Sequence, residues 1–366
     1  MGRKPLEDES DLSVSHGDYF GAVRDFLQQD DFKLILAALS QHIRRDVALE
    51  ELKAIRIVLE KHGEFYHPAR IVTTLLEAAI PLVLNVAVSN AGKSCVQQEC
   101  RILNKLNADF PFAFLPRVYG QGYVSAKDAG FETRMFLGEW FEGYSEFHLS
   151  RDPDDGKLKI IVWDSEHGNF FLKTDQTREL YRQAAKILAC YYNPVTFEHI
   201  SSWHHAAGDF VIKCEDEKVD VKLITVRQYR PMFVDNGGIE FQGPETVMIL
   251  EVLLVFFLSL AIRMRLDRRD GVGEIVWSDR GVLGPTMQGF LEALALKPLI
   301  SFLAEPLVDL FRKHLLACSR PDLLDLNHAI VQKMHPRAPD VAVIKKHLEQ
   351  HTNDLYDVIQ HDGDYP

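Results

Sequence analysis

The stretch WHHAAGDFVIKCEDEKVDVKLITVRQY, residues 203–229, decides the predicted fold. Two runs rich in Val, Ile, Leu and Phe flank the charged segment CEDEKVD (214–220), a pattern typical of a β-hairpin. Gly208 and Asp209 stand directly before the first of these runs. This order places a carboxylate at the mouth of a strand, where a substrate can reach it.

Further helices and strands are predicted on both sides of the hairpin. Apolar residues at spacings of three and four predict helices from Asp18 to about His62. These are followed by predicted strands over 82–88, 115–124 and 133–141, and by predicted helices over 95–106 and 175–192. Beyond the hairpin the pattern is mainly helical and is divided by prolines. The predicted fold class is therefore α+β.

The turn before the hairpin and the hairpin itself resemble the catalytic loop and the following hairpin of the protein-kinase-like fold, and the helix over 175–192 precedes them as a helix precedes that loop. The closest resemblance is to aminoglycoside and choline phosphotransferases, which carry His-Gly-Asp in this loop. The matching residues here are His205 and Asp209, with Ala206 and Ala207 inserted before Gly208. The resemblance covers roughly residues 69–232.

The resemblance implies an α+β, two-lobed protein with a ligand in the cleft between its lobes. Its parts would be an N-terminal helical extension (1–66), a small β-rich lobe (67–142) and a mainly helical large lobe (143–366). The implied hinge is 141–147, and ATP is the implied nucleotide. The resemblance also implies that Glu139, just before the hinge, contacts the nucleotide.

Compared position by position with a kinase-like site, this chain keeps two of five expected groups. Glu99 matches the helix glutamate and Asp209 the catalytic aspartate, which the resemblance makes a general base together with His205. The other positions differ: Asn85 replaces the strand lysine, Cys214 the asparagine, Thr225 the metal-binding aspartate and Arg227 the glycine after it.

These departures favour a degenerate kinase-like protein that binds a ligand or nucleotide with little or no transferase activity. No residue is predicted to bind a metal, and Mg²⁺ is not an expected cofactor, because the carboxylates that would hold it are missing. The alternative is an active small-molecule phosphotransferase that uses Asp209 as general base. Its missing positive charge would come from Lys93, Lys213, Lys222 or Arg227.

A second alternative is a P-loop NTPase. The segment AVSNAGKS, Ala87–Ser94, fits a relaxed Walker A pattern between a predicted strand and a predicted helix. It contains one glycine, however, and a cradle of backbone amides needs positive φ at several positions. The rest of the chain does not alternate strand and helix as a P-loop domain does.

Composition restricts the choice of partners and compartment. The chain has 366 residues, of which 46% are apolar and 26% charged, and a formal net charge of −12. This charge argues against nucleic acid or an anionic membrane as the main partner. The five scattered cysteines indicate reduced thiols, and the expected location is cytoplasmic. A protein partner could use the N-terminal helices, and the apolar run 247–262 is expected to be a buried helix.

Two further patterns carry structural expectations. In RMRLDRRDGVGEIVW (263–277), Arg263, Asp267 and Asp270 are spaced to share one helix face and form an ion-pair network. His347 and His351 lie four residues apart on a predicted helix. Their context HLEQH lacks the glutamate placement of a zinc protease, so a solvated helix face is expected.

Overall fold

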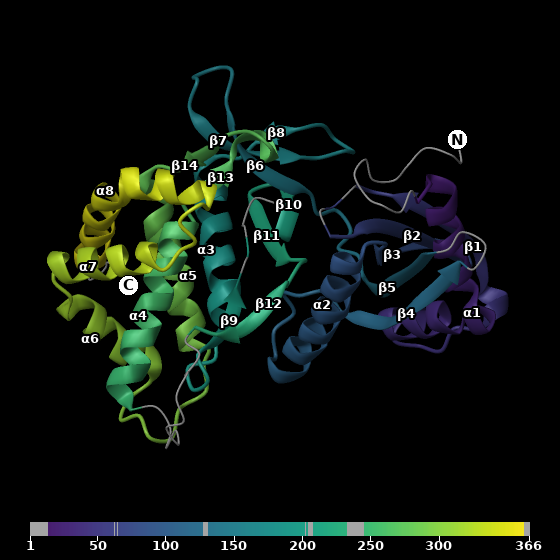
Figure 1. Cartoon of the computed structure of the whole chain (residues 1–366), viewed down its shortest axis with the longest axis horizontal. Helices are drawn as coiled ribbons and strands as arrows, with labels where there is room; N and C mark the ends of the chain where they lie inside the picture. Colours follow the sequence, from purple (N-terminus) through teal and green to yellow (C-terminus); the bar gives the residue numbers. More distant parts are fainter. Residues whose placement is uncertain are drawn as a thin grey trace. The chain divides into compact units, whose positions relative to one another are not determined.

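The computed structural model describes residues 14–61, 63, 65–126, 131–201, 203, 208–232 and 245–361. The chain is α+β, and its strands form small antiparallel sheets. It divides into two compact units, unit 1 (Met1–Glu142) and unit 2 (Gly143–Pro366) (Figure 1).

Unit 1 is built on a five-stranded sheet with the strand order β1-β2-β3-β5-β4. Its strands are β1 (Leu52–Leu59), β2 (His67–Leu75), β3 (Ala78–Ala87), β4 (Val118–Ala126) and β5 (Phe131–Glu139). Helix α1 (His16–Ile43) packs on β4 and β5, and helix α2 (Asn90–Asp109) packs on β3, β4 and β5. A short 3₁₀ helix, η1 (Leu49–Glu51), precedes β1. Strands β3, β4 and β5 and helix α2 confirm the predicted strand–helix–strand–strand order.

Helix α1 lies close to the sheet because strand β4 carries glycines beneath it. A Cβ atom on Gly120 would lie 2.4 Å from Leu34, and one on Gly122 would lie 2.9 Å from Phe26. The helix is interrupted at 29–32, where Asp30, Asp31 and Phe32 take left-handed φ angles of 49°, 53° and 64°. Side chains from both halves of α1 join the sheet in one core.

The helical prediction is confirmed for His16–Ile43 but wrong for Leu52–Leu59, which form strand β1. The spacing of Leu52, Ile55 and Leu59 suits a helix, but Ile55, Ile57 and Leu59 also alternate as a strand requires. Pairing with β2 from Ala54 to Leu59 selects the strand. The N-terminal extension is therefore not helical throughout.

Unit 2 combines helices with small antiparallel strand groups. Its helices are α3 (Thr174–Cys190), α4 (Thr246–Arg263), α5 (Leu283–Ala295), α6 (Leu307–Ala317), α7 (Arg320–Gln332) and α8 (Pro339–His361), with short 3₁₀ helices η3 (Arg269–Gly271) and η4 (Arg280–Val282). The strands are β6 (Glu146–Arg151), β7 (Leu158–Trp163), β8 (Phe170–Phe171), β9 (Glu198–Ser201), β10 (Phe210–Glu215), β11 (Lys218–Leu223), β12 (Gln228–Pro231), β13 (Leu266–Arg268) and β14 (Ile275–Trp277). Helix α3 and the hairpin β10–β11 confirm the predicted helix and hairpin.

Helix α4 lies in the core of unit 2. Among the described residues it is the one helix that is long and apolar enough to span a membrane, but 61% of it is buried inside the protein. Its Phe257 ring lies 4.9 Å from Phe290 and 6.0 Å from Phe311, measured between ring centroids. This aromatic packing accounts for an almost uninterrupted apolar sequence, and it confirms the predicted buried helix.

The segment 263–277 does not form the expected single helix. After α4 it turns into strands β13 and β14, because Asp270 and Gly271 adopt positive φ angles between them. The expected ion-pair network is therefore wrong, because Arg263, Asp267 and Asp270 do not share one helix face. Instead, Arg265 is buried and contacts Asp354 of α8 at 3.2 Å, and Asp267 accepts a hydrogen bond from the Leu149 amide at 2.6 Å. The first contact ties the residue before β13 to α8, and the second ties β13 to β6.

Candidate functional site

The hairpin β10–β11 brings Asp209 beside the residues that follow β11. Its register runs from Phe210 opposite Leu223 to Glu215 opposite Lys218, which leaves a two-residue turn. Beyond the paired residues, the Ile224 amide donates to the Asp209 carbonyl oxygen at 2.7 Å. The position of the predicted catalytic aspartate and the segment 225–227 therefore lie together at one end of the hairpin.

Asp209 and Arg227 form an ion pair at this end. Arg227 Nη1 donates to Asp209 Oδ2 at 2.7 Å; the Asp209 side chain is 1% exposed and the Arg227 side chain is 29% exposed. A carboxylate removed from water needs a charged or hydrogen-bonding partner, and a guanidinium supplies both. Gly208 provides the tight turn before Asp209 with a φ angle of 74°. Arg227, which stands where a kinase-like site has a glycine, thus binds Asp209, the predicted catalytic residue.

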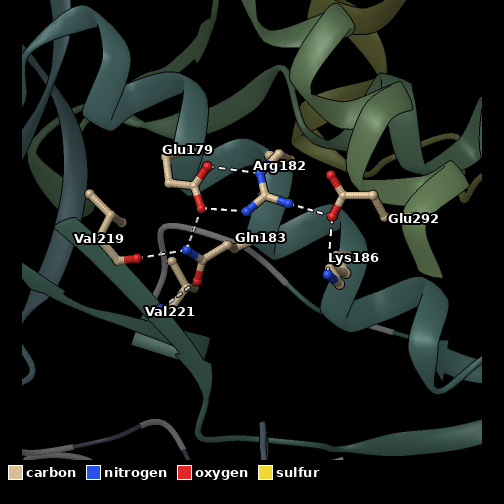
Figure 2. A network of polar contacts seen from close by, with 7 residues as sticks. All are labelled: Glu179, Arg182, Gln183, Lys186, Val219, Val221 and Glu292. Atoms are coloured by element: carbon tan, nitrogen blue, oxygen red, sulfur yellow. Dashed lines mark hydrogen bonds and ion pairs between the residues drawn. The ribbon is translucent and has the colours of Figure 1, made fainter. Parts of the chain in front are cut away.

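A polar network on helix α3 fixes the hairpin that carries this pair (Figure 2). Gln183 donates to the Val219 carbonyl oxygen at 2.6 Å and accepts from the Val221 amide at 2.9 Å, so its amide group bonds the edge of β11 that faces away from β10. Glu179 accepts from Gln183 and from Arg182, and Arg182 also bonds Glu292 of α5. Burial acts to raise the pKa of Glu179, but these hydrogen bonds hold it below its usual value.

The other side of the hairpin is held by the first residues of unit 2. Ser145 and Ile212 exchange two backbone hydrogen bonds, of 2.8 and 2.9 Å. The Tyr144 hydroxyl donates to Asp220 Oδ2 at 2.5 Å. Asp209 is therefore placed by a hairpin that is supported from both sides, a suitable arrangement for a binding residue.

Two of the lysines predicted to supply positive charge, Lys213 and Lys222, have acidic partners of their own. Lys213 Nζ lies 2.7 Å from Glu215 Oε1, and Lys222 Nζ lies 3.5 Å from Asp220 Oδ2. Cys214 is half-buried, and burial raises the pKa of its thiol to about 11, so it stays protonated at neutral pH. Among these candidates, the structure brings Arg227 to Asp209.

In unit 1 the predicted site residues lie on the sheet and on α2. Asn85 is a buried residue of β3, and Glu99 on α2 is fully buried. Glu99 Oε2 accepts a hydrogen bond from the Tyr66 hydroxyl at 2.8 Å. Glu139 ends β5 and accepts from the Arg117 amide at 3.2 Å. Sequence reasoning missed Tyr66, since a phenol partner for a buried carboxylate leaves no spacing signal.

The segment Ala87–Ser94, the alternative phosphate loop, is divided between the end of β3 and the first turn of α2. Strand β3 ends at Ala87 and α2 begins at Asn90, so the intervening connection is too short to wrap a phosphate. The Ser89 hydroxyl caps the helix by accepting from the Gly92 amide at 3.1 Å. A Cβ atom on Gly92 would lie 2.0 Å from the Phe65 carbonyl oxygen, so this glycine serves close packing. Lys93 consequently lies in the first helical turn.

The histidine predictions have different outcomes. His205 lies outside the described residues, so its role stays a prediction. The expectation of a solvated face for His347 and His351 is wrong, because His351 is fully buried and Trp277 packs on both rings. Burial, with Arg265 nearby, lowers the pKa of His351 to about 3. Within the described ranges, no group of three or more His, Cys, Asp or Glu side chains could hold a metal ion.

No family model matches the chain, and no curated protein sequence matches it.

Proposed function

We propose that the chain is a kinase-like protein with degenerate phosphotransfer machinery, and that it binds a nucleotide or another small anionic ligand at the Asp209–Arg227 turn. The observation that carries this proposal is the ion pair itself. A kinase-like site needs the catalytic aspartate to accept a proton from a substrate hydroxyl and a second aspartate to hold Mg²⁺. Here Arg227 binds the carboxylate of Asp209, and Thr225 stands where the Mg²⁺-binding aspartate would be.

The order of elements supports the kinase-like part of the proposal. In unit 1 a strand, a helix bearing Glu99 and two further strands follow one another as β3, α2, β4 and β5. In unit 2, helix α3 is followed by the hairpin that carries Asp209. The Glu99–Tyr66 bond is consistent with lost transferase activity. In active kinases this glutamate makes an ion pair with a strand lysine, whereas here Asn85 stands at the lysine position and the Tyr66 hydroxyl donates to Glu99.

Arg227 also suggests the chemistry of the ligand. Its guanidinium is partly exposed and always charged, and the planar fork of a guanidinium matches phosphate oxygens in geometry. A fixed cation would take over part of the charge compensation that Mg²⁺ gives in active enzymes. We therefore expect phosphate-containing ligands to bind with little dependence on Mg²⁺.

The test is a thermal-shift screen of the whole protein with ATP, GTP and ADP, each with Mg²⁺ and with EDTA. A ligand at about one hundred times its Kd stabilises the folded state by about 2.7 kcal/mol, so weak binding is measurable. Arg227→Ala should abolish the shift, whereas Arg230→Ala, an exposed arginine on β12, should leave it unchanged. The absence of a shift with every nucleotide would refute nucleotide binding.

The active phosphotransferase is kept as a second candidate because of one observation. Gly208 and Asp209 retain the tight turn at the start of β10, which is the placement that a general base needs. For catalysis, Arg227 would have to leave the Asp209 carboxylate when substrate arrives. Nucleotide binding that requires Mg²⁺, with turnover lost in Asp209→Ala, would favour this candidate over the first.

A further inference from the structure

Helix α3 contacts the hairpin β10–β11 through two glutamines on one helix face. Gln176 and Gln183 are seven residues apart, which corresponds to two turns and about 10 Å along the helix axis. Leu180 lies on the same face between them and is buried. Because Gln176 and Gln183 both donate to backbone carbonyl oxygens of the hairpin, this face has a hydrogen-bonding group at each end and an apolar contact in the middle.

Gln176 combines two contacts in one buried side chain. Its Nε2 donates at 3.1 Å to the carbonyl oxygen of Asp216, a turn residue of the hairpin with a left-handed φ angle of 55°. Its Oε1 accepts from the Lys173 amide at 3.0 Å, as a capping box does at the start of a helix. Lys173 also pairs with Glu217 of the turn, but these side chains are 68% and 70% exposed, and exposed pairs contribute little. The Gln176 oxygen therefore caps α3, whereas its nitrogen holds the turn of the hairpin.

Gln183 bonds β11 in the way that a neighbouring strand would. It donates to the Val219 carbonyl oxygen and accepts from the Val221 amide, two groups on the same edge of the strand. The backbone groups that face one edge recur every two residues, so the Val221 carbonyl and the Leu223 amide repeat this pattern. Gln183 alone would therefore accept the hairpin either where it lies or displaced by two residues, which is about 7 Å.

Apolar packing does not choose between these two positions. Alternate side chains of β11 are buried, and a displacement by two residues keeps the same side chains on the same face. Apolar contacts have no preferred direction, whereas a hydrogen bond requires its donor and acceptor within about 3.2 Å. A displacement of about 7 Å would carry the Asp216 carbonyl oxygen out of reach of Gln176. The contact between Gln176 and the turn therefore selects the observed position.

We propose that Gln176 is a positioning residue for the Asp209–Arg227 turn: with Gln183 it holds the hairpin at one position along α3, and so fixes where this turn lies in unit 2. For the ligand, this inference rests on the proposed function; for the hairpin, it rests on the contacts of α3. A protein whose binding-competent arrangement is only partly populated binds with a Kd divided by that populated fraction. Loss of the contact between Gln176 and the turn should therefore weaken nucleotide binding.

Two substitutions separate the two contacts of Gln176. Gln176→Glu keeps an oxygen for the Lys173 amide, and a negative charge near the start of a helix is favourable, but it loses the donor to Asp216. Gln176→Lys keeps a donor for the Asp216 carbonyl oxygen and loses the cap. The matched control, Gln97→Glu, makes the same change on an exposed residue of α2. Circular dichroism verifies that each variant folds.

The measurements are hydrogen exchange of the free protein and calorimetric titration with ATP. The Ser145 and Ile212 amides report the hairpin position, because each donates to the other residue's carbonyl oxygen on the β10 side of the hairpin. In Gln176→Glu these amides should exchange at least about tenfold faster than in the wild type. The Kd for ATP should rise at least about threefold, because a carboxylate that faces the Asp216 carbonyl leaves the observed position populated below about one third. Gln176→Lys and Gln97→Glu should match the wild type in both measurements.

Wild-type exchange in Gln176→Glu would overturn the proposal, and so would faster exchange with an unchanged Kd for ATP. The opposite pattern, in which Gln176→Lys is impaired and Gln176→Glu is not, would assign Gln176 to helix capping alone and equally overturn it. If the wild type binds no ATP, the proposed function fails. Exchange of the Ser145 and Ile212 amides in the free protein then still decides whether Gln176 sets the position of the hairpin.

Discussion

Removal of Arg227 should destabilise unit 2, because the buried carboxylate of Asp209 loses this charged partner. Breaking a fully buried ion pair costs about 3–5 kcal/mol, whereas exposed pairs contribute about 0–1 kcal/mol. Asp209 is 1% exposed but Arg227 is 29% exposed, so Arg227→Ala should cost about 2–3 kcal/mol. In a unit of this size, that cost corresponds to a decrease in Tm of about 5–10 °C.

The assay is urea unfolding of four proteins: wild type, Asp209→Asn, Arg227→Ala and the double variant. The double-mutant cycle should give a coupling free energy of about 1–3 kcal/mol between the two side chains. The matched control, Arg230→Ala, removes an exposed arginine three residues further along and should change the free energy of unfolding by less than about 0.5 kcal/mol. A coupling near zero would refute the claim that Arg227 stabilises the Asp209 carboxylate.

Three further changes test packing and polar contacts in the two units. Gly92→Ala should destabilise unit 1 by at least about 2 kcal/mol, because its methyl group meets the Phe65 carbonyl oxygen, whereas Gly21→Ala in open space should be neutral or slightly stabilising in thermal denaturation. Gln183→Ala leaves two backbone groups of β11 without that partner and should cost about 1–3 kcal/mol in urea unfolding. Because His351 has a folded pKa of about 3, the unfolded chain binds a proton that the folded chain does not as pH falls below about 6.5. As the pH falls from about 6.5 to about 3, the free energy of unfolding should therefore decrease by up to about 1.4 kcal/mol per pH unit. His351→Phe should reduce this slope.

Elements with strong local signals could be predicted from the sequence. Helix α2 has a clear apolar face, and the hairpin β10–β11 has two β-rich runs around a charged turn. The apolar residues of the segment Leu52–Leu59 fit both the spacing of a helix and the alternation of a strand. Only its pairing with β2 decides between them, and pairing is a property of the folded chain. The strand pair β13–β14 depends on positive φ at Asp270 and Gly271, which a helical spacing of charges conceals.

The candidate site could be predicted only as a set of positions. The turn before β10 identified Asp209, but nothing in the spacing indicated that Arg227 would bind it. The spacing of residues did not indicate the partners of Glu99 and His351 either. A buried carboxylate beside a phenol, or a histidine packed on Trp277, results from tertiary contacts between residues far apart in the chain.

The proposed degenerate site is tested most directly by calorimetric titration of ATP into the wild type and Asp209→Ala, in Mg²⁺ and in EDTA, with ATP consumption measured in parallel. We predict that the Kd for ATP differs little between Mg²⁺ and EDTA, and that ATP consumption with small-molecule acceptors stays at background. No carboxylate at Thr225 holds the metal, and Arg227 occupies the Asp209 carboxylate. A Kd that depends strongly on Mg²⁺, together with turnover that disappears in Asp209→Ala, would contradict the proposal and identify a working phosphotransferase.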